Sequence, residues 1–174
     1  MILDIARLLL FPALMAFAAA SDLLTMTISN RVSLVLCAGF FILALASGMG
    51  AADMLSHAGA GALVLGPAFG CFAMGWIGGG DAKIAAAAAL WFGFGHLMNY
   101  LLYASLFGGA LTLLLLQFRA WPLPLALTGQ AWLMRLHAKE GGIPYGIALA
   151  IGALMIYPET EWLKAVDFAQ FATG

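Results

Sequence analysis

The stretch Gly78-Gly79-Gly80-Asp81-Ala82-Lys83 separates two long apolar runs and places a carboxylate at their junction. A second aspartate, Asp22, follows the first apolar run of the chain, residues 2–20. No other acid in the first half of the sequence is placed in this way. The two aspartates are therefore predicted to act as a pair.

The composition of the chain indicates an integral membrane protein. Of its 174 residues, 64% are hydrophobic and only 9% are charged, and the mean hydropathy is +1.03. A typical soluble domain has about 25% charged residues. Since one helical crossing needs about 20 apolar residues, the length predicts an all-α polytopic protein with six transmembrane helices in a single domain, residues 1–174. The net charge of −1 offers no basic surface for nucleic acid.

Six apolar runs can be placed along the chain. The run from Ile84 to Phe118 is too long for one crossing, and its polarity changes around Gly93-Phe94-Gly95-His96, so a tight turn is predicted there. The predicted spans are residues 2–20, 32–49, 59–77 and 82–94, then the rest of the run that ends at Phe118, and finally residues 143–157. The predicted connections include residues 21–31, 51–58 and 119–142, and residues 158–174 form a tail.

The first run also has features of a cleavable signal peptide. Residues 17–21 resemble a small-residue cleavage site. However, Asp4 offsets Arg7, so the positively charged start that is typical of a signal peptide is missing. The run is therefore predicted to be an uncleaved first span.

The cysteines and histidines predict neither a metal site nor a cofactor. Cys37 and Cys71 lie in apolar runs without a C-x-x-C spacing and are expected to be buried free thiols. His57 and His96 fall on outer connections and His137 on an inner one, so the three cannot share a site.

Five of the seven basic residues fall on connections at the same side of the predicted bundle. They are Arg31, Lys83, Arg119, Arg135 and Lys139, whereas Arg7 and Lys164 lie near the termini. Basic residues are enriched on the cytoplasmic side of membrane proteins. The pattern predicts that both termini are extracytoplasmic and that Asp22 and Asp81 lie on the cytoplasmic side.

A pair of carboxylates at this depth suggests acid–base chemistry. Ionisable residues near hydrocarbon are costly and usually face the interior of a bundle or a wet cavity. Two carboxylates that meet there cannot both ionise cheaply, so one keeps its proton and the pair can act as general acid and general base on a water and a carbonyl. That is the arrangement of aspartyl proteases. The simpler alternative is that Asp81 only caps the fourth helix.

Three spaced motifs together resemble the type IV prepilin peptidase family, in particular its short members associated with tight-adherence (Flp) pili. The motifs are Asp22 followed by Ile28-Ser29-Asn30, then Gly78 to Lys83, and then Gly142-Ile143-Pro144-Tyr145-Gly146. The resemblance implies that Asp22 and Asp81 are catalytic and that Gly78, Gly80, Asn30, Lys83, Pro144 and Tyr145 support the site. Ile28-Ser29-Asn30 departs from the usual Ile-Pro-Asn.

The resemblance implies a membrane-embedded aspartic endopeptidase of the bacterial inner membrane. Its substrates would be prepilins and pseudopilins, cleaved on the cytoplasmic side between a short basic leader and an apolar helix. Cys37 and Cys71 do not match the paired cysteines of longer, methylating relatives, so methyl transfer is not predicted.

Individual supporting residues suggest specific roles. Gly78 and Gly80 are expected to keep the approach to Asp81 clear for an extended substrate. Lys83 is expected to reach phosphate headgroups rather than to act on Asp81. Pro144 suits the start of the sixth span, and Tyr145 can face the site.

Two other classes of protein also use intramembrane carboxylates. Presenilin-like proteases pair a G-x-G-D sequence with a Tyr-Asp, but Ala20-Ser21-Asp22 lacks the tyrosine. A small transporter or proton-conducting subunit would favour an internal repeat and a site at the membrane midplane. The two aspartates instead lie at span ends.

Overall fold

The computed structural model describes residues 1–168, and within that range the regular structure is helical without strands. The predicted all-α class is confirmed. The helices are α1 (Ile2–Thr25), α2 (Asn30–Ala46), α3 (Ala51–Ala73), α4 (Gly79–Ala120), α5 (Ala131–His137), α6 (Tyr145–Ile156) and α7 (Glu161–Lys164). Two short 3-10 turns, η1 (Leu125–Leu127) and η2 (Tyr157–Glu159), complete the set.

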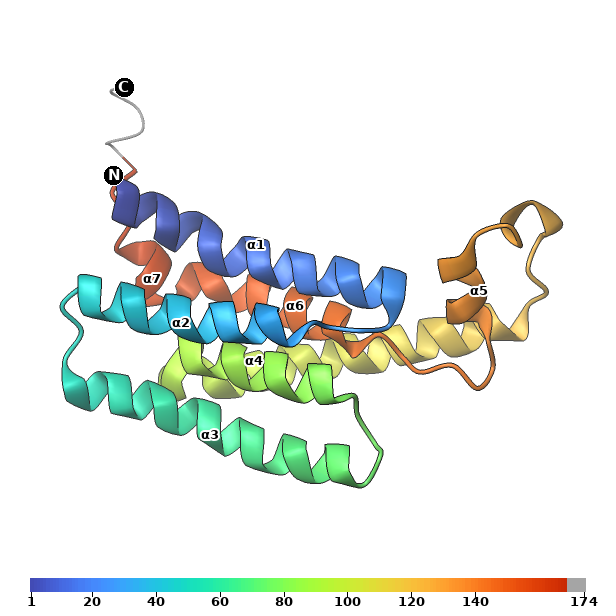
Figure 1. The fold of residues 1–174 in the computed structure, drawn as a ribbon, viewed down its shortest axis with the longest axis horizontal. Coiled ribbons are helices and arrows are strands. Elements are labelled where there is room, and N and C mark those ends of the chain that lie inside the picture. The colour runs from blue at the N-terminus through green and yellow to red at the C-terminus, as the bar shows by residue number, and fades with distance from the viewer. Residues whose placement is uncertain (169–174) are drawn as a thin grey trace.

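Helix α4 doubles back on itself at Gly93 (Figure 1). Gly93 has φ 56° and ψ −174°, a conformation that is essentially restricted to glycine. It divides α4 into a first arm, residues 79–92, and a second arm, residues 94–120. The turn predicted around Gly93 to His96 is therefore confirmed.

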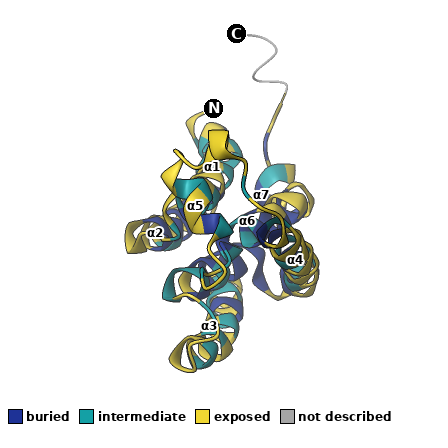
Figure 2. Cartoon of the chain, turned by 90° about the vertical axis from the view of Figure 1, so that its right-hand side faces the viewer, coloured by how far each residue is buried: buried dark blue, intermediate teal, exposed yellow. Residues whose placement is uncertain are grey.

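The helices have the length and surface of membrane-spanning elements. Within the described residues, α1, α3 and α4 are long and apolar enough to cross a membrane, while α2 and α6 are shorter apolar helices. Large apolar side chains are exposed on the outward face of the bundle, as at Leu102, Leu106 and Leu113 of α4, and Figure 2 shows exposed residues along the outer faces of the helices. Such a surface suits lipid, so the chain is a membrane protein.

Two predicted boundaries are wrong. Asp22 lies inside α1 rather than in a loop, because α1 continues to Thr25 and ends where Met26 adopts a left-handed conformation. Residues 51–58, predicted to be a connection, form the start of α3, which is capped by Gly50 and carries Asp53 in its first turn. An acid there interacts favourably with the helix macrodipole.

The bundle has two distinct ends (Figure 1). The start of α1, the α2–α3 connection and α7 lie at one end, here called the terminal end. Arg7 joins them, because its guanidinium donates to Ser47 Oγ (2.7 Å) and to the Ala165 carbonyl (3.3 Å). The α1–α2 and α3–α4 connections and α5 lie at the other end, here called the loop end.

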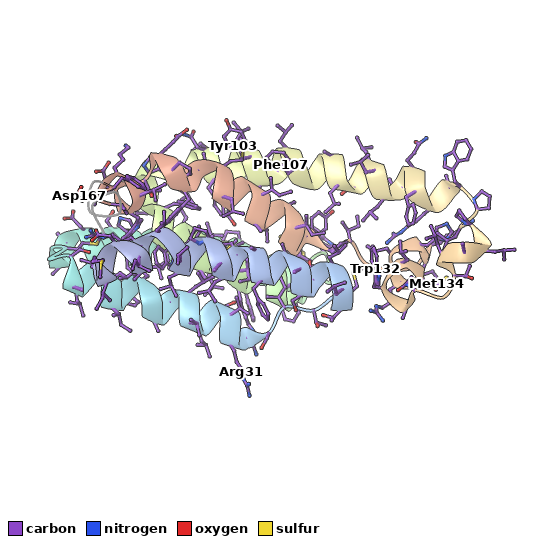
Figure 3. All side chains as sticks on the ribbon, turned by 90° about the horizontal axis from the view of Figure 1, so that it is seen from above. Arg31, Tyr103, Phe107, Trp132, Met134 and Asp167 are labelled. Carbon is purple, nitrogen blue, oxygen red and sulfur yellow. The ribbon has the colours of Figure 1, made fainter. Side chains whose placement is uncertain are left out.

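The basic residues concentrate at the loop end. Arg31 begins α2 and points away from the bundle (Figure 3). Arg119, at the end of α4, is buried and donates to the carbonyls of Leu136 and Gly142, both at 2.7 Å, so it fastens the segment between α4 and α6. The alternation of ends along the chain agrees with the order of spans predicted from sequence.

The core near the terminal end is aromatic and centred on Trp91. The Trp91 indole donates to the Leu36 carbonyl (3.0 Å), and the Trp162 indole donates to the Trp91 carbonyl (2.9 Å). Phe11 stacks on Tyr157 with ring centroids 4.7 Å apart and lies 5.1 Å from Trp91. These contacts connect α1, α2, α4 and the C-terminal turns into one unit.

We expect Gly93→Ala to destabilise the protein. A Cβ at this position would lie 2.9 Å from the His57 ring, and the backbone conformation disfavours any side chain. The expected loss is about 1–3 kcal/mol, or a midpoint of thermal unfolding lowered by roughly 2–10 °C. The measurement is thermal unfolding of the purified protein in detergent.

Gly95→Ala is the matched control, because a Cβ there meets nothing within 4 Å. Alanine is the better helix former, so Gly95→Ala should leave the midpoint unchanged or slightly raised. An equal loss in both variants would show that the turn does not depend on Gly93.

Candidate active site

Asp22 lies in the last turn of α1 and is 5% exposed. Its Oδ2 atom accepts a hydrogen bond from the backbone N–H of Gly146, at 2.8 Å. Gly146 is in the first turn of α6, whose N-cap residue, Pro144, provides no side-chain acceptor. The first N–H groups of a helix have no partner within the helix. The Asp22 carboxylate therefore satisfies a donor that α6 leaves free.

A side chain at position 146 would displace Asp22 or Ile28. A Cβ there would lie 2.8 Å from Asp22 Oδ2 and 2.8 Å from Ile28 Cδ1, closer than van der Waals contact allows. The start of α6 can therefore approach both the end of α1 and the loop that follows it. This close approach is what brings the amide within hydrogen-bonding distance of the carboxylate.

Asp81 lies in the first turn of α4 and is half-buried. It shares a cavity of about 230 Å³ with Asp22, and the cavity walls also include Met26, Thr27, Ile28 and the three glycines 78–80. The two carboxyls are close enough to interact electrostatically. The structure thus brings together the two aspartates that the sequence predicted as a pair.

The start of α4 is compatible with the helix-cap alternative, because a side chain three residues after the N-cap can reach back to the N-cap N–H. Gly78 occupies the N-cap position, and Asp81 follows three residues later. A carboxylate in the first turn still interacts favourably with the helix N-terminus. That interaction positions Asp81, which also lines the cavity that it shares with Asp22.

The glycines 78 and 80 line the dyad cavity and also allow close packing around it. A Cβ at Gly80 would lie 3.0 Å from Ile28 Cβ and 3.3 Å from the Ile28 carbonyl oxygen. A Cβ at Gly78 would lie 2.9 Å from Asp81 Oδ2. The side of Gly80 that a Cβ would occupy is therefore filled by Ile28 of the α1–α2 loop, a packing role that the sequence did not predict. The glycine allows that loop to pack on the start of α4.

Asn30 and Lys83 are not part of the shared cavity. Lys83 Nζ donates to Asn30 Oδ1 at 2.8 Å, which links the start of α2 to the first arm of α4. Both residues line a separate groove of about 560 Å³ between α2, α3 and the first arm of α4. Lys83 is thus engaged by a side chain of the protein, where the sequence suggested lipid headgroups.

Pro144 and Tyr145 lie beside the site. Pro144 is fully buried at the start of α6. Tyr145 lines another groove, of about 610 Å³, which also contains Asp81, and its hydroxyl lies 3.3 Å from Thr112 Oγ1. Tyr145 therefore shares a groove with Asp81 but does not line the cavity that contains both aspartates.

Sequence reasoning missed Gly146 and Ile28 as individual contributors. Both lie within the quoted motifs, but nothing in the local sequence marks a backbone amide as a partner of Asp22, or Ile28 as the neighbour of Gly80 and Gly146. Thr112 lies in an apolar run outside the three motifs.

The cysteines and histidines of the chain do not line the cavity that contains the two aspartates. Cys37 and Cys71 are free but half-buried, so the expectation of fully buried thiols is wrong. His57 and His96 line a cavity of about 520 Å³ at the terminal end, where His57 Nδ1 lies 2.8 Å from the Leu90 carbonyl oxygen. Among residues 1–168, no group of three or more His, Cys, Asp or Glu side chains could hold a metal ion.

Comparison with known proteins identifies the family of the chain. No curated protein and no solved structure matches the chain. The model of the type IV leader peptidase family matches residues 9–113, which include Asp22, the Gly78–Lys83 stretch and most of α4. The match covers more than half of the chain and contains both aspartates of the shared cavity. The chain therefore belongs to the type IV leader peptidase family.

Proposed function

We propose that Asp22 and Asp81 form the catalytic dyad of a peptidase that removes the short basic leader from type IV prepilins and pseudopilins, with Flp-like prepilins as the preferred substrates. Membership of the leader peptidase family supports this reaction in general. One observation carries the proposal for the dyad. Two carboxylates from α1 and α4 share one small cavity, and the Gly146 amide holds one of them in place.

The arrangement suits hydrolysis of a peptide bond. When one carboxyl is protonated and the other is ionised, the ionised carboxylate takes a proton from water as the water oxygen attacks the scissile carbonyl carbon. The protonated carboxyl gives its proton to the carbonyl oxygen, and a tetrahedral diol forms. Transfer of a proton to the amide nitrogen then breaks the C–N bond and yields a carboxylic acid and an amine.

The depth of the pair suits a substrate that crosses the membrane boundary. Asp22 precedes the end of α1 by one turn, and Asp81 lies in the first turn of α4. Both therefore lie at the ends of apolar helices, near the edge of the hydrocarbon region. A prepilin presents its cleavage site at the same boundary, because its leader is polar and the helix that follows is apolar.

The distribution of basic residues supports a cytoplasmic position for the dyad. Arg31, Arg119 and Arg135 belong to the loop end, whereas Arg7 belongs to the terminal end. The positive-inside tendency assigns the loop end to the cytoplasm. The enzyme would then lie in the bacterial inner membrane with its N-terminus and α7 at the extracytoplasmic face.

Asp22→Asn and Asp81→Asn should each abolish leader removal. An amide can neither take nor give the proton, and acid–base catalysis contributes about 10²–10⁴-fold, so processing should fall at least about 10²-fold. The measurement is the shift of a co-expressed prepilin to its mature size, with enzyme abundance in the membrane determined in parallel. Efficient processing by either variant would refute the catalytic role of the dyad. If the protein were instead an ion transporter, the wild type would also leave the prepilin uncut.

Gly80→Ala should lower cleavage per enzyme molecule by about tenfold. The new Cβ must displace Ile28, which lines the dyad cavity and also contacts the position of Gly146. Overpacking of this kind costs about 1–3 kcal/mol, and a small misplacement of catalytic groups reduces the rate strongly.

Gly79→Ala is the matched control for this variant. Its Cβ would meet the ring of Phe72, which is 45% exposed and can rotate away. Gly79 lines the dyad cavity as well, but its Cβ would meet Phe72 rather than Ile28, so activity should fall much less than in Gly80→Ala, by about twofold at most. Equal activities of the Gly79→Ala and Gly80→Ala variants would contradict the importance of the contact with Ile28.

Labelling of single cysteines tests the orientation. In a variant with Cys37→Ser and Cys71→Ser, a membrane-impermeant maleimide applied outside the inner membrane should modify Ala51→Cys, at the terminal end. Glu140→Cys, in the segment between α5 and α6, should react only after the membrane is opened. Both positions are exposed, so access depends on the side of the membrane. The opposite pattern would place the dyad at the extracytoplasmic face.

A further inference from the structure

A groove of about 610 Å³ begins at Asp81 and runs between the two arms of α4 and the start of α6. The first arm contributes Asp81 and Ala85, the second arm contributes residues between Leu101 and Leu113, and α6 contributes residues from Tyr145 to Leu149. This surface is here called the Asp81 groove. Asp81 also lines the dyad cavity, so the two hollows meet at a carboxylate of the dyad.

Resting on the proposed function, we propose that the apolar helix that follows the cleavage site of the substrate docks lengthwise in the Asp81 groove. The groove would thus determine which segment of a membrane protein reaches the dyad. It would select a straight apolar helix that starts directly after the scissile bond.

The lining of the groove suits a helix rather than a compact ligand. Ala85, Ala104, Gly108, Gly109 and Ala148 have small side chains or none. Small residues allow two helix backbones to approach closely within a membrane. The larger apolar side chains of the lining are compatible with an apolar partner; they are Ile77, Leu101, Leu113 and Leu149.

The polar groups of the groove gather mainly at the end nearest the dyad. Asp81, Thr112 and Tyr145 line this end, and the Tyr145 hydroxyl lies 3.3 Å from Thr112 Oγ1. A substrate helix lying in the groove would therefore place its first, still unpaired backbone groups beside polar partners. Its apolar turns would lie deeper, along Ala85 and Leu101.

The length of the groove agrees with this orientation. From Leu101 to Leu113 the second arm rises about 18 Å, which corresponds to about three turns of a partner helix. The groove is therefore long enough to hold the beginning of a membrane-spanning helix and to align it with the dyad.

The second groove of similar volume does not meet this requirement. It lies between α2, α3 and the first arm of α4 and is lined by residues that include Cys37, Ala62 and Lys83. Neither Asp22 nor Asp81 contributes to it. A helix in that groove would end beside Lys83 rather than beside the dyad.

Two matched variants test which groove is used. Gly109 lines the Asp81 groove, and a Cβ there meets nothing within 4 Å, so Gly109→Leu should fold normally while filling the groove. Ala62→Leu fills the second groove at an exposed position. Prepilin cleavage per enzyme molecule should fall about tenfold or more in Gly109→Leu, because the leucine side chain prevents the close approach of the substrate helix, and stay within about twofold in Ala62→Leu. Normal cleavage by Gly109→Leu would overturn the proposal.

A cross-linking experiment tests binding separately from catalysis. The enzyme carries Asp22→Asn to prevent turnover, and the prepilin carries one cysteine in the second turn of its apolar helix. Ser105→Cys, with Cys37 and Cys71 replaced by serine, should form a disulfide with the prepilin. An enzyme that retains only its native Cys37, in the second groove, should not.

The outcomes separate this inference from the proposed function. Failure of the wild-type enzyme to cleave the prepilin refutes the function. Normal cleavage by the wild type, together with a cross-link to Cys37 alone or none to Ser105→Cys, refutes only the docking of the helix in the Asp81 groove.

Discussion

The hydrogen bond from the Gly146 amide to the Asp22 carboxylate is the contact on which the candidate site depends. Helix α6 begins with an N–H group that has no partner in its own helix, and α1 ends with a buried carboxylate that needs a donor. The amide provides the donor that the carboxylate needs, and the carboxylate provides the acceptor that the amide needs. A buried polar group without a partner costs about 1–3 kcal/mol, so this contact also fixes the end of α1 against the start of α6. Asp22 is thereby held in the cavity that it shares with Asp81.

Ile28 links the remaining parts of the site. Its side chain and backbone lie against Gly80 at the start of α4, and its Cδ1 lies against Gly146 at the start of α6. Neither neighbour has room for a Cβ without displacement. Three segments from different parts of the chain thus converge on one apolar residue, and the absence of two side chains makes that convergence possible. The glycine run acts through packing within the enzyme as well as through its place beside Asp81.

The two ends of the bundle have different physical characters. The terminal end is held by aromatic packing and indole hydrogen bonds around Trp91. The loop end is held by hydrogen bonds to backbone groups, such as those from Arg119 to the carbonyls of Leu136 and Gly142. An aromatic anchor at one end fixes the helices relative to one another. The loop end can then accommodate the dyad cavity and the Asp81 groove, which meet at Asp81.

The sequence by itself determined the membrane-embedded, all-α class, the break at Gly93 and the positions of Asp22 and Asp81 near helix ends. These features follow from local composition, because hydropathy marks helices in lipid and glycine and aspartate mark their interruptions. The tertiary structure decided that Gly146 binds Asp22, that Ile28 fills the space beside Gly80, and that Lys83 pairs with Asn30 away from the dyad. Those contacts join residues far apart in the chain, so they depend on helix packing, which no local pattern encodes.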